Sequence, residues 1–396
     1  MTAEGLLRVR KAHEHGKVSF VELFFDLVFV FAITQLSHSL LGHLTLIGLA
    51  QTALLMLAVW WVWIFTSWVT NWLDPEKLPV RLALLVLMGL GLLMSSALPQ
   101  AFEARGLAFA LAYVAMQVGR SLFFLWAVRG RPGMVRNFQR ILAWLSLGGG
   151  FWIAGGLAEG ETRLLLWGLG LALEYASPSL GFWVPGLGRS ESTDWDVEGG
   201  HLSERCALFI IVALGESVLV TGATFAEMPW SAVTVAAFLT SFVGSLAMWW
   251  LYFDSTAETG SHRIAHARDP GRLARLVYTY IHLLPVAGIV VTAVADEMVL
   301  AHPLGHASAA ASAAILGGTA LYLLGSLLFR WTIGGQLPWS CLLGLLALAA
   351  LLPLASHLAP LWLSLATTVV LVLIAAWEAS DRHRRQCAAV LELSES

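Results

Sequence analysis

Long apolar runs separated by short polar breaks set the pattern of this chain. A helix needs about 20 apolar residues to cross a bilayer, and runs of roughly that length recur along the sequence. They lie near 19–41, 46–70, 82–98, 106–128, 141–157 and 164–183, and again near 205–222, 230–252, 276–295, 308–329, 338–356 and 360–378. The pattern predicts an all-α polytopic integral membrane protein with about 12 transmembrane helices.

The longest polar break, rich in Gly and Ser, falls at 185–203, after the sixth run. Such a stretch is typical of a linker, and it divides the chain into a six-helix repeat at 1–184 and a second one, with a short basic tail, at 204–396. The segment RLALLVLMGLGLLMSSALP from Arg81 resembles RLVYTYIHLLPVAGIVVTA from Arg275. An even number of spans in each half makes the two predicted repeats parallel.

The basic residues are unevenly distributed between the two sides of the predicted membrane. If the N-terminus lies inside, 20 of the 23 lysines and arginines fall in inner segments. Arg105 and Arg163 fall outside, and Arg120 lies within a span. Because short cytoplasmic loops collect Lys and Arg, we expect both termini and the linker to be cytoplasmic.

The composition agrees with a membrane protein. The 396 residues are 58% hydrophobic and 12% charged, about half the charged fraction of an ordinary soluble domain. No basic patch typical of nucleic-acid binding is visible, and no nucleotide-binding Gly-rich loop, HExxH or GxSxG motif occurs. The three cysteines have no metal-ligand spacing. We therefore expect neither an enzyme nor a cofactor or metal site.

The first run carries two acids, Glu22 and Asp26, one helical turn apart. A charge at mid-membrane costs roughly 2.5–3.5 kcal/mol, so both acids should face the protein interior and pair with a base, for which Arg120 and His282 are the candidates. Several charged or polar residues fall at a similar depth near the inner side and could form one cluster, although those at span ends fit an interfacial position too. They are Glu22, Asp26, Arg120, Glu204, Arg205, Asp254, Arg275 and His282.

Glu216 is the most deeply placed acid of the sequence. It lies ~16 Å into a span whose apolar core is ~30 Å thick, which is the bilayer midplane. Gly215 and Ser217 beside it permit close helix approach and supply a hydroxyl. This setting favours a functional over a structural role for Glu216. Glu174, near the middle of another run, leaves both roles open.

Two further features concern single helices. Arg275, Tyr278, His282 and Pro285 share one helical face, which indicates a bent helix lining a cavity; a histidine bonded to a neighbouring carbonyl is the alternative.

Many of the tryptophans lie near span ends and indicate an aromatic belt at the membrane interface. The examples are Trp60, Trp61, Trp63, Trp68 and Trp72.

Two segments carry a resemblance to a known family. VELFFDLVFVFAITQLSHSL and HLSERCALFIIVALGESVL strongly resemble the bacterial low temperature requirement A (LtrA) family, and the similarity in length and span layout covers nearly the whole chain. The resemblance implies a polytopic bacterial inner-membrane protein that is associated by name with growth in the cold. It also implies a set of polar positions: Glu22, Asp26, His38, Glu204, Arg205, Glu216, Ser217, Asp254 and His282.

Three functional classes remain open. Twelve spans with midplane acids favour a secondary transporter of an ion or small solute that uses intramembrane carboxylates, with Arg120 and Tyr278 joining the family's polar positions along the pathway. A cation channel is the second class, because FFDLVFVFAIT is similar to the FSDxVFAIAIT opening of a family of six-span potassium channels, with Phe25 and Leu27 departing from that motif. A membrane scaffold or stress-adaptation protein without transport is the third. Expected partners are membrane lipid and an unknown small solute or ion, with no nucleic acid.

Overall fold

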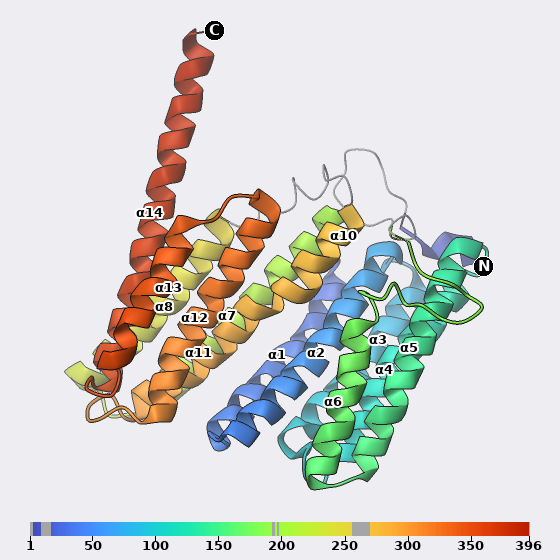
Figure 1. Ribbon diagram of the computed structural model, residues 1–396, viewed down its shortest axis with the longest axis horizontal. Helices are drawn as coiled ribbons and strands as arrows, with labels where there is room; N and C mark the ends of the chain where they lie inside the picture. The colour runs from blue at the N-terminus through green and yellow to red at the C-terminus, as the bar shows by residue number, and fades with distance from the viewer. Residues whose placement is uncertain (1–2, 9–16, 192–194, 196–197, 256–269, 396) are drawn as a thin grey trace. The chain divides into compact units, whose positions relative to one another are not determined.

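The computed structural model describes residues 3–8, 17–191, 195, 198–255 and 270–395 (Figure 1). These described residues form helices joined by connections, and no strand occurs among them. The all-helical architecture agrees with the predicted fold class. The chain divides into two compact units, which are described separately below.

The first unit contains residues 1–205 and 268–274. Its helices α3 and α4 pack together, α1 packs on α3, α5 packs on both α4 and α6, and α2 contacts α1, α4 and α6. The six helices are α1 (Phe20–Gly42), α2 (Leu46–Trp72), α3 (Leu78–Ala97), α4 (Gly106–Ala127), α5 (Pro132–Leu157) and α6 (Gly160–Ala176). A short 3₁₀ turn, η1 (Ala3–Leu6), precedes them, and another, η2 (Leu98–Gln100), follows α3.

The second unit contains residues 206–267 and 275–396. Its helices are α7 (Gly199–Ala226), which begins in the first unit, α8 (Ala232–Ser255), α11 (Leu283–Ala301), α12 (Ala309–Gly334), α13 (Trp339–Leu351) and α14 (Pro360–Glu395). The short α10 (Pro270–Ala274) and the π-helical segment η4 (Arg275–Ile281) lead into α11. Helices α11 and α12 form a close pair, and α14 packs on α8.

A helix lies at each of the twelve apolar runs seen in the sequence. Within the described ranges, nine segments are long and apolar enough to cross a membrane. Helices α5, α6 and α13 are not among them. The structure therefore supports a multi-pass membrane protein, whereas twelve crossings remain a prediction.

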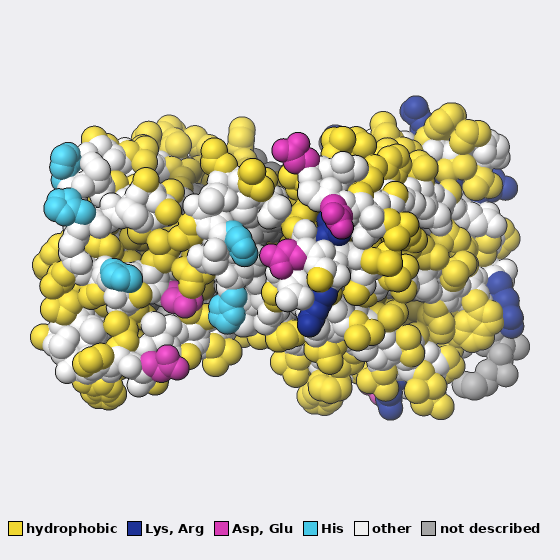
Figure 2. All heavy atoms as spheres, turned by 90° about the horizontal axis from the view of Figure 1, so that it is seen from below, with side chains coloured by type: hydrophobic (Ala, Val, Ile, Leu, Met, Phe, Trp, Pro, Cys, Tyr) yellow, Lys and Arg dark blue, Asp and Glu magenta, His cyan; other side chains and the backbone are white. Residues whose placement is uncertain are grey.

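Much of the outer surface is apolar. Leu93, Leu219 and Leu373 are each 63–64% exposed, and many other large apolar side chains on the helices are also exposed. Figure 2 shows one face of the molecule, on which hydrophobic side chains predominate and charged ones are scattered. So many exposed large apolar side chains fit burial of this surface in lipid.

Glycines allow α11 and α12 to approach closely. A Cβ added at Gly288 would lie 2.5 Å from the backbone nitrogen of Tyr322, and one at Gly325 would lie 2.3 Å from Cδ of Pro285. Small residues at such contacts are typical of helix packing in membranes, where backbone approach supplies van der Waals contact. These positions fix the pairing that holds the middle of α11 in place.

The aromatic belt predicted for α2 is wrong. Its tryptophans lie inside the first unit, and Trp61 stacks on Tyr175 with ring centroids 4.1 Å apart. A helix that is apolar on all its faces is buried on all of them, and α2 has tryptophans at successive positions that no single outward face can hold. The buried set is Trp60, Trp61, Trp63, Trp68 and Trp72.

Candidate functional site

Glu22 lies in the first turn of α1, where the backbone itself supplies donors. Its carboxylate accepts hydrogen bonds from the backbone N–H and from the hydroxyl of Ser19, both at 2.9 Å. The positive end of the helix dipole also favours an acid at this position. The Ser-x-x-Glu spacing at the start of α1 thus fixes the orientation of the carboxylate before any distant residue contributes.

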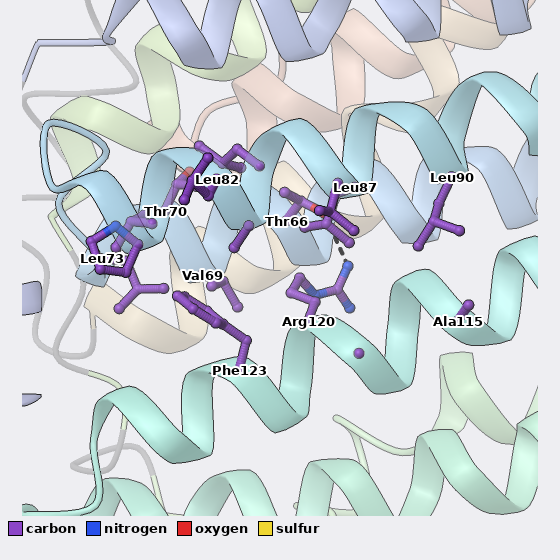
Figure 3. A pocket seen from close by; sticks show the side chains of 16 residues that line it. Thr66, Val69, Thr70, Leu73, Leu82, Leu87, Leu90, Ala115, Arg120 and Phe123 are labelled. Carbon is purple, nitrogen blue, oxygen red and sulfur yellow. Dashed lines mark hydrogen bonds between the residues drawn. The ribbon is translucent and has the colours of Figure 1, made fainter.

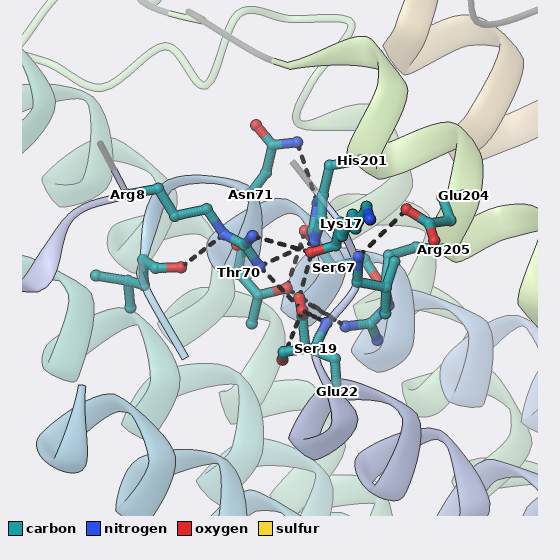
Figure 4. Close-up of polar contacts among 12 residues, drawn as sticks. Arg8, Lys17, Ser19, Glu22, Ser67, Thr70, Asn71, His201, Glu204 and Arg205 are labelled. Atoms are coloured by element: carbon teal, nitrogen blue, oxygen red, sulfur yellow. Dashed lines mark hydrogen bonds and ion pairs between the residues drawn. The ribbon is translucent and has the colours of Figure 1, made fainter. Parts of the chain in front are cut away.

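Three basic or polar side chains from distant parts of the first unit converge on Glu22 (Figure 4). Arg8 donates from Nη2 at 2.9 Å, Arg205 donates from Nη1 at 3.1 Å, and His201 lies with Nε2 at 3.0 Å. The side chains of Glu22, His201 and Arg205 are fully buried. Together with Asp26 these residues are called the Glu22 cluster below.

The contacts of His201 indicate its tautomer. Its Nδ1 faces the amide nitrogen of Asn71 at 3.4 Å, which can only donate, so Nδ1 accepts and the ring proton is on Nε2. Nε2–H then donates to Glu22, and the 3.1 Å approach of Nη2 of Arg8 to Nε2 is a contact between two donors rather than a hydrogen bond. In this arrangement His201 is neutral.

Asp26 faces the protein interior, as predicted, but its partners differ from the predicted ones. Its Oδ1 accepts from Nη2 of Arg205 at 2.7 Å and from the indole N–H of Trp63 at 2.8 Å. Arg120 and His282 make other contacts, so naming either of them as the partner is wrong. The predicted depth in the membrane could not identify the partner of Asp26, because Arg205 of α7 lies at a depth similar to that of Arg120 and His282.

The Glu22 cluster is balanced in charge. Two carboxylates face two guanidiniums, and the neutral imidazole adds no charge. Removing one partner of a buried ion pair is strongly destabilising, whereas the intact pair is nearly neutral in energy. The arrangement therefore ties the N-terminal segment, α1 and the start of α7 together, and it leaves no uncompensated charge for an ion to replace.

Glu174 of α6 ends a chain of hydrogen bonds inside the first unit. The hydroxyl of Tyr113 and, at 3.1 Å, the indole N–H of Trp152 donate to its carboxylate. The amide N–H of Gln117 donates to the Tyr113 oxygen at 3.3 Å, and Nη2 of Arg120 donates to the amide oxygen of Gln117. Arg120 is thus linked to Glu174 through two neutral side chains, and no base lies within ion-pair distance of Glu174 in the described ranges.

The second unit holds an acid that the sequence analysis missed. Asp296 is 4% exposed, and its Oδ2 lies 3.2 Å from the hydroxyl of Ser217, which in turn lies 2.9 Å from the hydroxyl of Ser245. No Lys, Arg or His in the described part of the chain lies within 4.0 Å of its carboxylate. The predicted span ended at 295, but α11 continues to Ala301 and carries Asp296 into the bundle.

Glu216 is also buried in α7, next to Ser217. Ser217 is a site residue predicted from the family resemblance, and its contacts now join α7, α8 and α11. The apolar residues 298–301 that follow Asp296 were the sequence signal that the helix extends past residue 295.

The π-helical segment carries two other predicted residues. Nε2 of His282 donates to the backbone carbonyl of Cys206 at 3.1 Å. A histidine bonded to a neighbouring carbonyl was the alternative to a cavity-lining role for His282. Tyr278 is buried and packs edge-on against His282 and Phe329, with ring centroids 6.2 and 5.8 Å apart. The segment Arg275–Ile281 is π-helical, whereas a bend that lines a cavity stays a prediction.

The remaining predicted residues lie apart from these groups. Asp254 pairs with Arg382 at 2.6 Å. Glu204 is exposed and accepts from the backbone N–H of Val18 at 3.2 Å. His38 is exposed on α1. Of the eight residues expected to form one cluster near the inner side, Glu22, Asp26 and Arg205 share one network among the described contacts. In the described ranges no group of three or more His, Cys, Asp or Glu side chains could hold a metal ion.

Comparisons with known proteins agree with the resemblance seen in the motifs. Residues 17–376 match the family described as bacterial low temperature requirement A protein. An uncharacterized protein of Rhizobium meliloti (strain 1021) is 42% identical over 384 residues, which cover 95% of this chain and 92% of the relative. No solved structure matches the chain.

Proposed function

Because the chain belongs to the bacterial low temperature requirement A family, we propose that it is an inner-membrane secondary transporter that couples movement of an ion or small solute to a change of charge on buried carboxylates. The setting of Asp296 carries this proposal. A buried carboxylate with only hydroxyl partners must either hold a proton or bind a cation, since an isolated charge is costly in a low-dielectric interior.

The hydroxyl chain at Asp296 is suited to proton movement. When Asp296 is ionised, Ser217 donates its single proton to the carboxylate and must accept from Ser245. When Asp296 is protonated it can donate to Ser217, and the chain can reverse its direction without any heavy atom moving. A proton-coupled site requires one set of groups that can form hydrogen bonds both with and without the proton, and the Asp296, Ser217 and Ser245 side chains can do so.

Within this proposal the Glu22 cluster has a structural role. Its charges are balanced inside the first unit, so a cation that bound there would have to displace a guanidinium. Glu174 is the counterpart of Asp296 in the first unit, because its donors are a hydroxyl and an indole rather than a base. Glu174 and Asp296, which have no base in contact within the described ranges, would change charge during transport, and the paired acids would not.

The proposal includes the topology predicted from the sequence: twelve crossings arranged as two parallel six-helix repeats with both termini in the cytoplasm. A similarity in packing supports the repeats, because the second helix contacts the sixth in each half, α2 with α6 and α8 with α14. The one-sided distribution of lysine and arginine supports the orientation.

The orientation can be tested with Ser190→Cys. Cys206 and Cys341 are buried and Cys387 is exposed, so a Cys387→Ser background leaves no exposed native thiol. We expect a membrane-impermeant maleimide to label residue 190 only after the inner membrane is permeabilised. Cys387 in the unmodified chain, on the C-terminal helix, should behave in the same way. Labelling of residue 190 in intact spheroplasts would contradict the proposed topology.

The transport proposal itself is tested with purified protein in liposomes that contain a pH-sensitive dye. A panel of cations and small solutes is applied as gradients, and proton flux and solute uptake are recorded together with currents in planar bilayers. We expect saturable uptake accompanied by proton flux and no unitary currents. Unitary currents would favour the channel, and absence of any flux for the whole panel, with the protein shown to be folded, would favour a scaffold.

Glu216→Gln keeps the shape of the side chain and removes its charge. Because Glu216 is buried in α7 beside the serine that contacts Asp296, we expect the variant to insert and to elute as the wild type does, while coupled uptake falls to background at every pH tested. Normal uptake between about pH 5 and 8 would exclude a coupling role. Failure to accumulate in the membrane would instead indicate that Glu216 is structural.

A further inference from the structure

A cavity of about 390 Å³ lies in the first unit, between α2, α3 and α4 (Figure 3). Its walls are mainly leucine and valine side chains of α3, with Val69 of α2 and Phe123 of α4. Ligand sites are typically about 300–1,000 Å³ in volume and apolar, with a few polar groups that fix orientation. The volume and the lining of this cavity are those of a site for one small ligand.

Among the described residues that line this cavity, Arg120 is the only charged one. It is 2% exposed and reaches from α4 toward Thr66 of α2 (Figure 3). No carboxylate in the described part of the chain lies within ion-pair distance of its guanidinium. A buried cation without an acid in contact is costly unless an anionic partner is supplied, and the cavity is where such a partner can reach it.

The hydrogen bonds of Arg120 account for three of the five N–H donors of its guanidinium, within the described part of the chain. Nη1 donates to the carbonyl of Val62 at 3.1 Å and to the hydroxyl of Thr66 at 3.0 Å, and Nη2 donates to Gln117. Three of the five N–H donors are therefore used. The two that remain are on Nη2 and on Nε, and Nε is buried without a partner. Nε and Nη2 form the edge with which arginine binds both oxygens of one carboxylate.

The mouth of the cavity faces the apolar surface of the first unit. Leu82 and Val86 of α3 are 52% and 64% exposed, and Ala115 and Gly119 of α4 are also exposed, while all four line the cavity. A ligand that enters between these residues comes from the hydrocarbon region of the membrane. Such a ligand must itself be largely apolar, which excludes phosphate, chloride and sugars as occupants.

We propose that this cavity binds a single-chain amphiphile that ends in a carboxylate, such as a long-chain fatty-acid anion. The carboxylate accepts from the N–H groups of Arg120 that have no partner in the described ranges, and the chain lies along the apolar walls toward Leu82 and Val86. This site goes beyond the proposed transport function and does not depend on it. Through Gln117 and Tyr113, however, the bound anion is linked to Glu174.

Binding of radiolabelled palmitate to the purified protein in phosphatidylcholine nanodiscs tests the proposal. Competitors matched in chain length separate charge from apolarity. We expect unlabelled palmitate to compete, hexadecanol to need a roughly tenfold higher concentration because it lacks the charge-assisted bonds, and hexadecyltrimethylammonium to fail. Equal competition by the cation, or equal competition by two-chain phosphatidylglycerol, would overturn the proposal.

Two tryptophan variants locate the site. A Cβ at Gly119 meets no atom within 4 Å, so Gly119→Trp can fill the cavity without disturbing Arg120, and we expect it to abolish palmitate binding. Gly89 is likewise exposed on α3 with open space around it, but it does not line the cavity. Gly89→Trp is the matched control and should bind palmitate as the wild type does. Wild-type binding by Gly119→Trp would refute the proposed location.

Two further variants test the charge and the alternative occupant. Arg120→Met should lose the preference for palmitate over hexadecanol; if it does not fold, Gly119→Trp still decides the outcome. Ala115→Cys tests whether a second copy of the chain fills the cavity instead. Efficient disulfide cross-linking of two copies at residue 115, with no palmitate binding, would show that the face is a contact between copies.

Discussion

Replacing Arg205 by Met is expected to destabilise the protein by about 3–5 kcal/mol, the cost of breaking a buried ion pair by removing one partner. Arg205 contacts both acids of the Glu22 cluster. Glu22 keeps Arg8 and His201 when Arg205 is lost, but Asp26 keeps only the indole N–H of Trp63. The uncompensated Asp26 carboxylate is therefore the main source of the loss. The loss of stability is measured on the detergent-solubilised protein, by size-exclusion chromatography after heating to a series of temperatures.

A second substitution distinguishes this mechanism from a simple loss of packing. Asp26→Asn in the Arg205→Met background removes the uncompensated charge and keeps an oxygen for Trp63, so the double variant should be more stable than Arg205→Met alone. Arg129→Met is the control, because Arg129 is exposed and contacts only the ring of Trp126; it should change stability by less than about 1 kcal/mol. A double variant that is less stable than Arg205→Met would contradict the argument.

The positions of the helices could be predicted from the sequence with little error, because a run of about 20 apolar residues has few alternatives in a bilayer. The partners of the buried acids could not be predicted from the sequence. Arg8 and His201 come from the N-terminal segment and the predicted linker, where polar residues carry no periodic signal. Only the fold brings His201 within 3.0 Å of Glu22, across 179 positions of sequence.

Two errors of sequence interpretation had a signal that could have corrected them. Adjacent tryptophans at 60 and 61, followed by Trp63, cannot all face one interface, and their pattern fits a helix that is enclosed on every side. Asp296 is the first residue beyond the span predicted at 276–295, although the four residues from Met298 to Ala301 are apolar. An acid one turn before the end of an apolar run is still inside the bundle when the helix continues past it.

A functional effect as large as that of Glu216→Gln is expected at Asp296. Asp296→Asn keeps the shape of the side chain and its contact with Ser217, but the amide can neither release nor take up a proton. Since no base lies within 4.0 Å of the carboxylate in the described ranges, the substitution leaves no unpaired cation, and the variant should fold and insert normally. We expect proton-coupled uptake in liposomes to fall to background. Ser217→Ala, which interrupts the hydroxyl chain but keeps the acid, should reduce the rate by roughly tenfold or more.

Glu297→Gln is the matched control for this experiment. Glu297 is the next residue on α11, is only half-buried, and makes no contact with the Ser217–Ser245 pair among the described hydrogen bonds. Its neutralisation should leave uptake unchanged, because the charge that matters is one held inside the bundle without a counter-ion. If Asp296→Asn transports as the wild type does while Glu297→Gln does not, the coupling acid is misassigned. If both variants transport normally, a buried carboxylate bonded only to hydroxyls is not by itself a coupling site in this fold, and Glu174 becomes the acid to test next.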